Sequence, residues 1–118
     1  MMLVYMYFSQ LNEQEQQTIL ESMKAVLESG KLEFEYSSRL GIDEEDLKQV
    51  IEKFPNLDDS DDSSNETLAI NNCLNEICYG VNFTENDWRK WFSQSYEEVE
   101  KVYKRWAELR SWNHTGIR

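Results

Sequence analysis

The sequence predicts an all-α protein, a compact bundle of about six helices formed by two copies of a helix–short helix–helix unit with approximate internal two-fold symmetry. Three observations support this fold class. Apolar residues recur at helical spacing, capping residues and glycines bracket the amphipathic segments, and the pattern of the first half recurs in the second. The chain has 118 residues, 40% hydrophobic and 13% aromatic, so we expect a single domain over residues 1–118.

The first half contains two predicted long helices with a short segment between them. The first helix covers residues 12–29, with Asn12 as its N-cap and Gly30 as a left-handed stop. A short segment over 33–40 follows, and the second long helix begins at its cap, Asp43. The apolar stripes of the two long helices are Ile19, Leu20, Met23, Val26 and Leu27, and then Leu47, Val50, Ile51 and Phe54.

The second half has the same order of predicted elements. A helix over 66–79 is ended by Gly80, and Thr84 resembles the cap of a short helix that carries two tryptophans. Ser95 and Glu98 form a capping-box pattern that opens the last long helix. The apolar stripe of that helix is Val99, Val102, Tyr103, Trp106 and Leu109.

The two halves align with a nearly constant offset, which predicts a duplication. An offset of 50 residues places Gly30 on Gly80, and an offset of 52 places the cap Asp43 on the cap Ser95. The apolar stripes then coincide as well. We therefore expect a first repeat over about 12–57, an acidic linker over 58–65 and a second repeat over about 66–112, because two such units can bury each other's stripe.

Two segments also allow a β interpretation. Residues 3–8 and 32–36 could be strands flanking the first helix, since Leu32, Phe34 and Tyr36 alternate with polar residues. The repeat favours helix, because the counterpart of the second segment looks like a helix start. We expect the apolar run 1–8 to dock into the core or to form a homodimer seam, since it is too short to span a bilayer.

The charge of the chain restricts its partners. The formal net charge is −11, and residues 12–66 carry it with 16 acidic and five basic side chains, whereas the tryptophan-rich remainder is neutral. Such a charge repels nucleic acid and anionic membranes, so we expect a basic protein partner, no direct nucleic-acid binding and no membrane association. Two cysteines without disulfide spacing and the lack of a visible targeting signal predict a cytoplasmic location.

The sequence shows no constellation for catalysis, a cofactor or a metal. His114 is the only histidine and lies near the chain end, which removes most zinc sites and histidine-assisted triads. The acidic linker does not match a calcium loop, because counting from Asp58 places Ser63 where the loop needs glycine and Ala69 where it needs glutamate. We therefore expect no enzyme. Glu76, which falls within an apolar stripe, is the one candidate for a functional buried carboxylate.

The composition thus favours a small acidic protein-interaction module. Acidic bacterial immunity proteins, antitoxins and inhibitors resemble it in size and charge, a likeness of composition alone. The candidate partner-binding residues are Trp88, Trp91, Asp43, Glu44, Asp46, Asp58, Asp59, Asp61 and Asp62. One alternative is a nucleic-acid mimic whose carboxylates form a continuous stripe that occupies a DNA-binding groove. The other is a small-ligand binder or enzyme with a pocket between the repeats.

Overall fold

The computed structural model describes residues 6–110, and every regular element within that range is helical. The all-α fold class and the number of helices are thereby confirmed. The elements are η1 (Phe8–Gln10), α1 (Glu13–Ser29), α2 (Tyr36–Leu40), α3 (Glu44–Lys53), α4 (Asn65–Asn75), η2 (Glu76–Gly80), α5 (Glu85–Trp91) and α6 (Tyr96–Leu109). The η1 element is a 3₁₀ turn, whereas η2 is a π-helical turn that continues α4.

The strand alternative is wrong for the described residues. Residues 31–34 form a turn and Tyr36 begins α2, so the alternation of apolar residues here comes from a turn that leads into a helix. In the other segment, Phe8 lies in η1 and is buried, as docking of the N-terminal run requires. Residues 1–5, on which the rest of that expectation and of the dimer seam falls, lie outside the described residues.

Side-chain caps fix the helix starts. The Glu15 backbone N–H donates to Asn12 Oδ1 at 2.8 Å, and the Asp46 N–H donates to Asp43 Oδ1 at 2.9 Å. Both caps are reciprocal capping boxes, which satisfy N–H groups that the helix itself leaves without partners. The helices α4, α5 and α6 also have side-chain caps, which are Ser64, Thr84 and Ser95.

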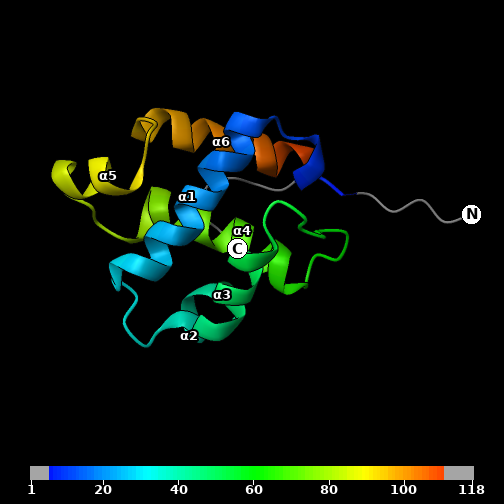
Figure 1. Cartoon of the computed structure of the whole chain (residues 1–118), viewed down its shortest axis with the longest axis horizontal. Helices are drawn as coiled ribbons and strands as arrows, with labels where there is room; N and C mark the ends of the chain where they lie inside the picture. The colour runs from blue at the N-terminus through cyan, green and yellow to red at the C-terminus, as the bar shows by residue number, and fades with distance from the viewer. Residues whose placement is uncertain (1–5, 111–118) are drawn as a thin grey trace, which may run out of the picture.

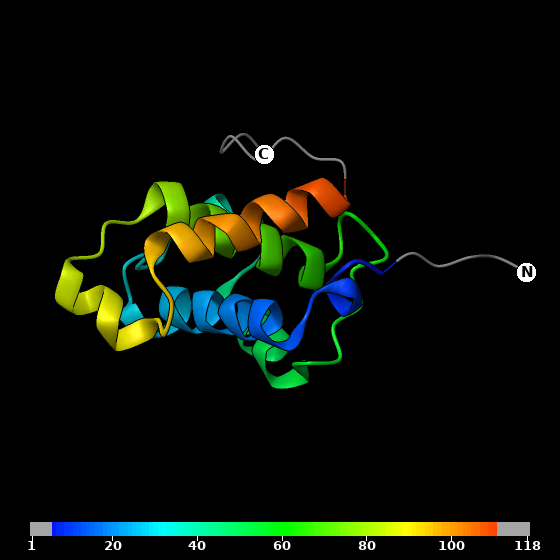
Figure 2. The ribbon, with the colours of Figure 1, turned by 90° about the horizontal axis from the view of Figure 1, so that it is seen from above.

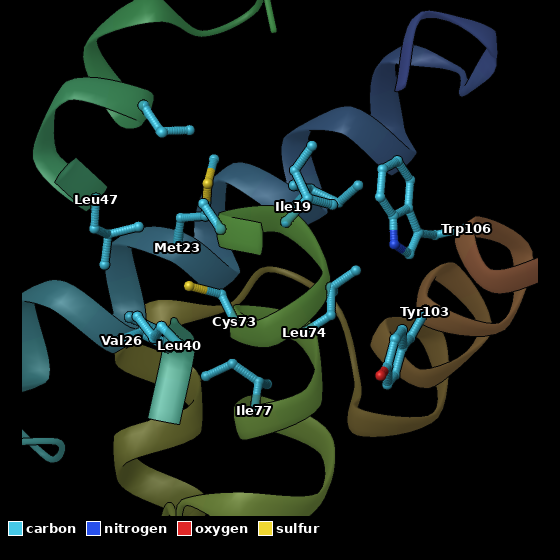
Figure 3. Close-up of a cluster of buried hydrophobic side chains, with 14 of the residues drawn as sticks. Ile19, Met23, Val26, Leu40, Leu47, Cys73, Leu74, Ile77, Tyr103 and Trp106 are labelled. Carbon is cyan, nitrogen blue, oxygen red and sulfur yellow. The ribbon is translucent and has the colours of Figure 1, made fainter. Parts of the chain in front are cut away.

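The core lies around α4, which packs against α1, α2, α3 and α6 (Figure 1). Figure 3 shows Cys73 and Leu74 of α4 and Ile77 of η2 between side chains of α1 on one side and of α6 on the other. The largest fully buried side chains include Trp106 and Tyr103 of α6. Because the apolar stripes of α1, α4 and α6 converge here, burial of these stripes is the main stabilising contribution to the fold.

The helix-ending glycines act for different reasons. Gly30 and Gly41 adopt positive φ angles of 70° and 77°, which favour glycine because it has no Cβ. Gly80 does not share this conformation. A Cβ at Gly80 would lie 2.2 Å from the Glu76 Oε1 atom, so any other residue there would force the buried Glu76 carboxylate to shift.

The polar composition of the acidic linker over 58–65, which has no hydrophobic residue, favours a mobile surface segment, but the structure holds this linker to the rest of the molecule. Asp59 is completely buried, and its carboxylate accepts hydrogen bonds from the backbone N–H groups of Tyr7 and Phe8, each at 3.0 Å. Leu57 is buried as well. A polar segment can therefore be held in place by one buried carboxylate that accepts hydrogen bonds from the backbone of another segment. No helix within residues 6–110 has the length and apolar character needed to cross a membrane.

Candidate partner-binding site

Four aromatic rings gather where α5 turns into α6. The Trp88 and Phe92 rings stack with centroids 4.2 Å apart at 20°, and the Tyr96 ring lies 5.8 Å from Trp88. Phe83 meets Trp88 and Phe92 edge-on, at 6.5 Å from each. Such offset and edge-to-face geometries are those that aromatic pairs prefer.

The local structure explains why the Phe83, Trp88 and Tyr96 rings are partly exposed, whereas Phe92 is buried. The helix α5 has seven residues, none of them buried, and it lies at one end of the molecule (Figures 1 and 2). Two hydrogen bonds hold the rings at this position: Trp88 Nε1 donates to the Gln94 carbonyl at 2.7 Å, and the Tyr96 hydroxyl donates to the Cys78 carbonyl at 2.6 Å. The polar atoms of both rings are therefore satisfied inside the protein.

The four rings line a pocket of about 590 Å³, which we call the aromatic pocket. Its other lining residues are Thr84, Glu85, Arg89, Ser93, Gln94, Ser95 and Glu97. Three of the rings, those of Phe83, Trp88 and Tyr96, also line a smaller neighbouring pocket of about 180 Å³. These three rings thus separate two hollows at the same end of the molecule.

The rim of the aromatic pocket carries more negative than positive charge. Arg89 pairs with Glu85 at 2.7 Å within α5. The exposed Glu97 carboxylate forms no ion pair or hydrogen bond within the described part of the chain. Outside the pocket lining, the Lys31 ammonium lies 5.3 Å from the Phe83 ring centroid and 3.8 Å from an Asp87 carboxylate oxygen.

The structure separates the two predicted tryptophans. Trp88 lines the aromatic pocket, whereas Trp91 does not, although both are half-buried and pack against the core. The Lys90 ammonium lies 5.3 Å from the Trp91 ring centroid and covers part of its face. Trp88 is therefore the better candidate of the two for contact with a partner.

The chain matches no protein-family model, and no similar curated protein or solved structure was found. The site itself therefore carries the functional argument.

The predicted acidic residues of α3 have local partners. Asp43 and Asp46 form the capping box described above, and the Glu44 carboxylate lies 3.8 Å from the Lys48 ammonium one turn further on. All of these contacts stabilise the helix that carries them. Their carboxylates remain at the surface, because Asp43 and Glu44 are exposed and Asp46 is half-buried.

The predicted acidic residues of the linker fall into two classes. Asp58 and Asp61 are exposed and accept hydrogen bonds from a serine two residues later, which lowers the pKa of each carboxyl below its ordinary value. Asp59 is buried and contacts Arg110, while the largely exposed Asp62 carboxylate contacts the same guanidinium. Asp59 is thus unavailable at the surface, and the linker offers Asp58, Asp61 and Asp62.

Glu76 is buried, as its place in the apolar stripe suggested, and it forms an ion pair with Arg39. It lies at the first position of the π-helical turn η2, where the Val81 N–H donates to the Glu76 carbonyl at 2.7 Å. Glu76 lines neither hollow beside Trp88. Within residues 6–110, no three histidine, cysteine, aspartate or glutamate side chains are grouped to hold a metal ion.

Sequence reasoning missed three of the four pocket rings. Trp88, Phe92 and Tyr96 recur at intervals of four residues, a spacing that on a continuous helix would place them on one face. Phe92 instead adopts an extended conformation that ends α5, so the rings come from two helices and the connection between them. The spacing was a usable signal for clustering, but not for the pocket.

Proposed function

We propose that this chain is a small protein-interaction module that binds a basic protein partner through the aromatic pocket between α5 and α6. The observation that carries the proposal is a cluster of four aromatic rings from α5, the start of α6 and the segments that flank α5, around a hollow with carboxylates at its rim. Aromatic side chains in such pockets supply most of the binding energy in many protein interfaces. Immunity-, antitoxin- and inhibitor-like binders belong to this class.

The overall charge supports the choice of partner. A net charge of −11 attracts a basic protein from a distance and accelerates its association, whereas it repels other acidic surfaces. The aromatic pocket would then determine how long the complex lasts, because short-range contacts mainly affect the dissociation rate. The two features act at different stages of the same encounter.

We also infer that the two halves are copies related by a two-fold axis. The packing pattern supports this: exchanging α1 with α4, α2 with α5 and α3 with α6 turns each of the main inter-helix contacts into another one that exists. For example, α2 packs on α4, and α5 packs on α1. An experimental structure in which α1–α3 superpose on α4–α6 by a two-fold rotation would support the inference, and unrelated crossing angles would refute it.

The duplication would explain where the site arose. Tyr36 in the first half corresponds to Trp88 in the second at the offset of 52. Tyr36 is buried, whereas Trp88 is half exposed and lines a pocket. The second short helix would thus have moved outward from the packed position that the first retains, which left its aromatic rings free to contact another protein.

Partner capture by the immobilised full chain from cytosol of its own source tests the proposal. Trp88→Ala and Glu97→Gln should reduce capture of a basic protein, because they change the pocket and its rim. Phe34→Ala and Glu45→Gln are matched controls: Phe34 is a highly exposed aromatic outside the pocket, and Glu45 is an exposed glutamate at the position corresponding to Glu97. Helical circular dichroism should show that each variant is folded.

The outcome separates this proposal from its alternatives. If Trp88→Ala and Glu97→Gln capture the partner as well as the two control variants do, the pocket is not the binding surface. A nucleic-acid mimic predicts instead that moderate salt abolishes capture and that charge-neutralising changes at Asp43, Asp58 and Asp61 act more strongly than Trp88→Ala. The ligand-pocket hypothesis based on Glu76 has weaker support, because that carboxylate is paired with Arg39 beneath Gly80.

A further inference from the structure

We infer that the aromatic pocket receives the cationic side chain of a lysine or arginine from the partner protein, a conclusion that rests on the function proposed above. The pocket offers ring faces for an apolar stem and carboxylates for a positive head group. Lysine and arginine combine these two properties in one side chain. Most polar groups of the pocket already have hydrogen-bond partners within the protein, which leaves the rings and a carboxylate to contact a ligand.

The hydrogen-bonding groups of the rings do not face a ligand. Trp88 Nε1 and the Tyr96 hydroxyl donate to backbone carbonyls of Gln94 and Cys78, at 2.7 Å and 2.6 Å. One face of the Trp88 indole is covered by the stacked Phe92 ring, with centroids 4.2 Å apart, so a ligand in the pocket can meet only the other face of Trp88. The face of an aromatic ring attracts a cation within about 6 Å of its centroid, and tryptophan does so most strongly.

Most polar side chains of the rim are also engaged within the protein. The hydroxyls of Thr84 and Ser95 accept hydrogen bonds from helix N–H groups at 3.1 Å and 3.2 Å, and Ser93 donates to Glu21 at 3.0 Å. Arg89 is paired with Glu85. Among the charged side chains of the rim, the Glu97 carboxylate alone has no ion pair or hydrogen bond within residues 6–110; the neutral side-chain amide of Gln94 makes no hydrogen bond there either.

The groups that line the pocket favour a positively charged side chain as its occupant. An anionic side chain would meet two rim carboxylates, and the one positive side chain of the lining, Arg89, is already paired with Glu85, so its burial would be unfavourable. A neutral apolar side chain would contact the rings but would gain nothing from Glu97. A cation contacts the rings and pairs with Glu97, and the net charge of −11 adds to the attraction.

The protein already contains one such arrangement. The Lys31 ammonium lies 5.3 Å from the Phe83 ring centroid and 3.8 Å from Asp87, so a ring and a carboxylate bind one lysine together. Phe83 is also a wall of the aromatic pocket. Trp88 and Glu97 would bind a partner's side chain in the manner in which Phe83 and Asp87 bind Lys31.

The experiment titrates the folded full chain with three small probes: N-acetyl-lysine amide, N-acetyl-arginine amide and N-acetyl-norleucine amide. Norleucine has an apolar stem like that of lysine but no charge. The readout is the indole N–H resonance of Trp88 in ¹H–¹⁵N spectra, assigned by its loss in Trp88→Phe. We expect saturable shifts with the two cationic probes, and binding weakened by about two- to five-fold in Glu97→Gln, whereas Glu45→Gln leaves it unchanged.

Three results would overturn the inference. They are norleucine binding as tight as lysine binding, equal affinity of the cationic probes for Glu97→Gln and the unaltered chain, and a Trp88 resonance that no probe moves. Each leaves the interaction proposal standing if Trp88→Ala still abolishes partner capture. Conversely, if the cationic probes bind at Trp88 but Trp88→Ala does not reduce partner capture, the interaction proposal is contradicted and the cation site is supported. The relative affinities of the lysine and arginine probes decide between the two head groups.

Discussion

Arg110 and Asp59 lie 51 residues apart in the sequence and form an ion pair whose side chains are 2% and 0% exposed. The guanidinium donates to the Asp59 carboxylate at 3.1 Å and to the Asp59 carbonyl at 2.9 Å. It also lies 4.7 Å from the ring centroid of Tyr7. One pair of side chains therefore joins the N-terminal segment, the acidic linker and the end of α6.

Asp59→Ala should destabilise the fold by about 3–5 kcal/mol, because it leaves two backbone N–H groups without their acceptor and removes the buried carboxylate that pairs with the Arg110 guanidinium. Asp62→Ala is the matched control. It removes a neighbouring contact to the same guanidinium from a largely exposed carboxylate, so its cost should stay below about 1 kcal/mol. Urea denaturation measures both values, and equal costs for the two substitutions would refute the special role of Asp59.

Gly80→Ala should lower the free energy of unfolding by about 1–3 kcal/mol, because the new Cβ would overlap the Glu76 carboxylate and displace it from Arg39. The same substitution in a Glu76→Ala background should cost much less, since the atoms that clash are gone. A double-mutant cycle by thermal or urea denaturation measures this coupling. Additive costs would show that Gly80 is needed for some other reason.

Stability should decrease at alkaline pH. Burial raises the pKa of the Cys78 thiol from 9.0 to about 12, so the native state retains a proton that the unfolded chain has released. This contribution is complete below about pH 9 and is lost as the pH rises toward 12, because the native state binds more protons across that interval. Burial also raises the pKa values of Tyr36 and Tyr96, which adds to the decrease.

Cys78→Ala provides the control for this pH dependence. Its free energy of unfolding, measured by urea denaturation at several pH values, should fall less steeply above about pH 9 than that of the unaltered chain. Identical slopes would mean that the thiol does not titrate differently in the two states. A native thiol with so high a pKa should also react slowly with alkylating reagents at neutral pH.

Backbone amide protons of α5 should exchange with solvent faster than those of α4. No residue of α5 is buried, whereas seven of the eleven residues of α4 are. Elements with few buried contacts open at low free energy without global unfolding. Hydrogen exchange followed by mass spectrometry measures both helices in one sample, and equal protection would show that α5 is as firmly packed as the core. Slower exchange of α5 after partner addition would locate the interface.

Much of the fold was predictable because local rules and tertiary packing agree. Asn12, Asp43, Thr84 and Ser95 are the N-caps that their sequence patterns indicated, and each receives the expected backbone hydrogen bond. Capping depends on residues three positions apart, so it is visible in sequence. The π-helical turn that begins at Glu76 was not visible in the sequence; in this turn the buried Glu76 carboxylate pairs with Arg39 and lies close to Gly80.

The candidate site was predictable only in part. Trp88 was identified because an aromatic residue on a very short helix is hard to bury. Phe83, Phe92 and Tyr96 were missed, because they come from different segments whose relative placement depends on the turn after α5. Asp59 was assigned to the surface with its acidic neighbours, since sequence alone does not distinguish one aspartate from the next in such a run.

The helical fold class, the helix starts and the apolar stripes follow from the amino-acid order, because each depends on neighbours within one or two turns of the chain. Which carboxylates are buried, and which aromatic rings share a pocket, depend on how the segments fold against one another. Asp59 illustrates the reason. A carboxylate becomes buried when distant donors replace its water, and here Arg110, Tyr7 and Phe8 come from opposite ends of the described chain.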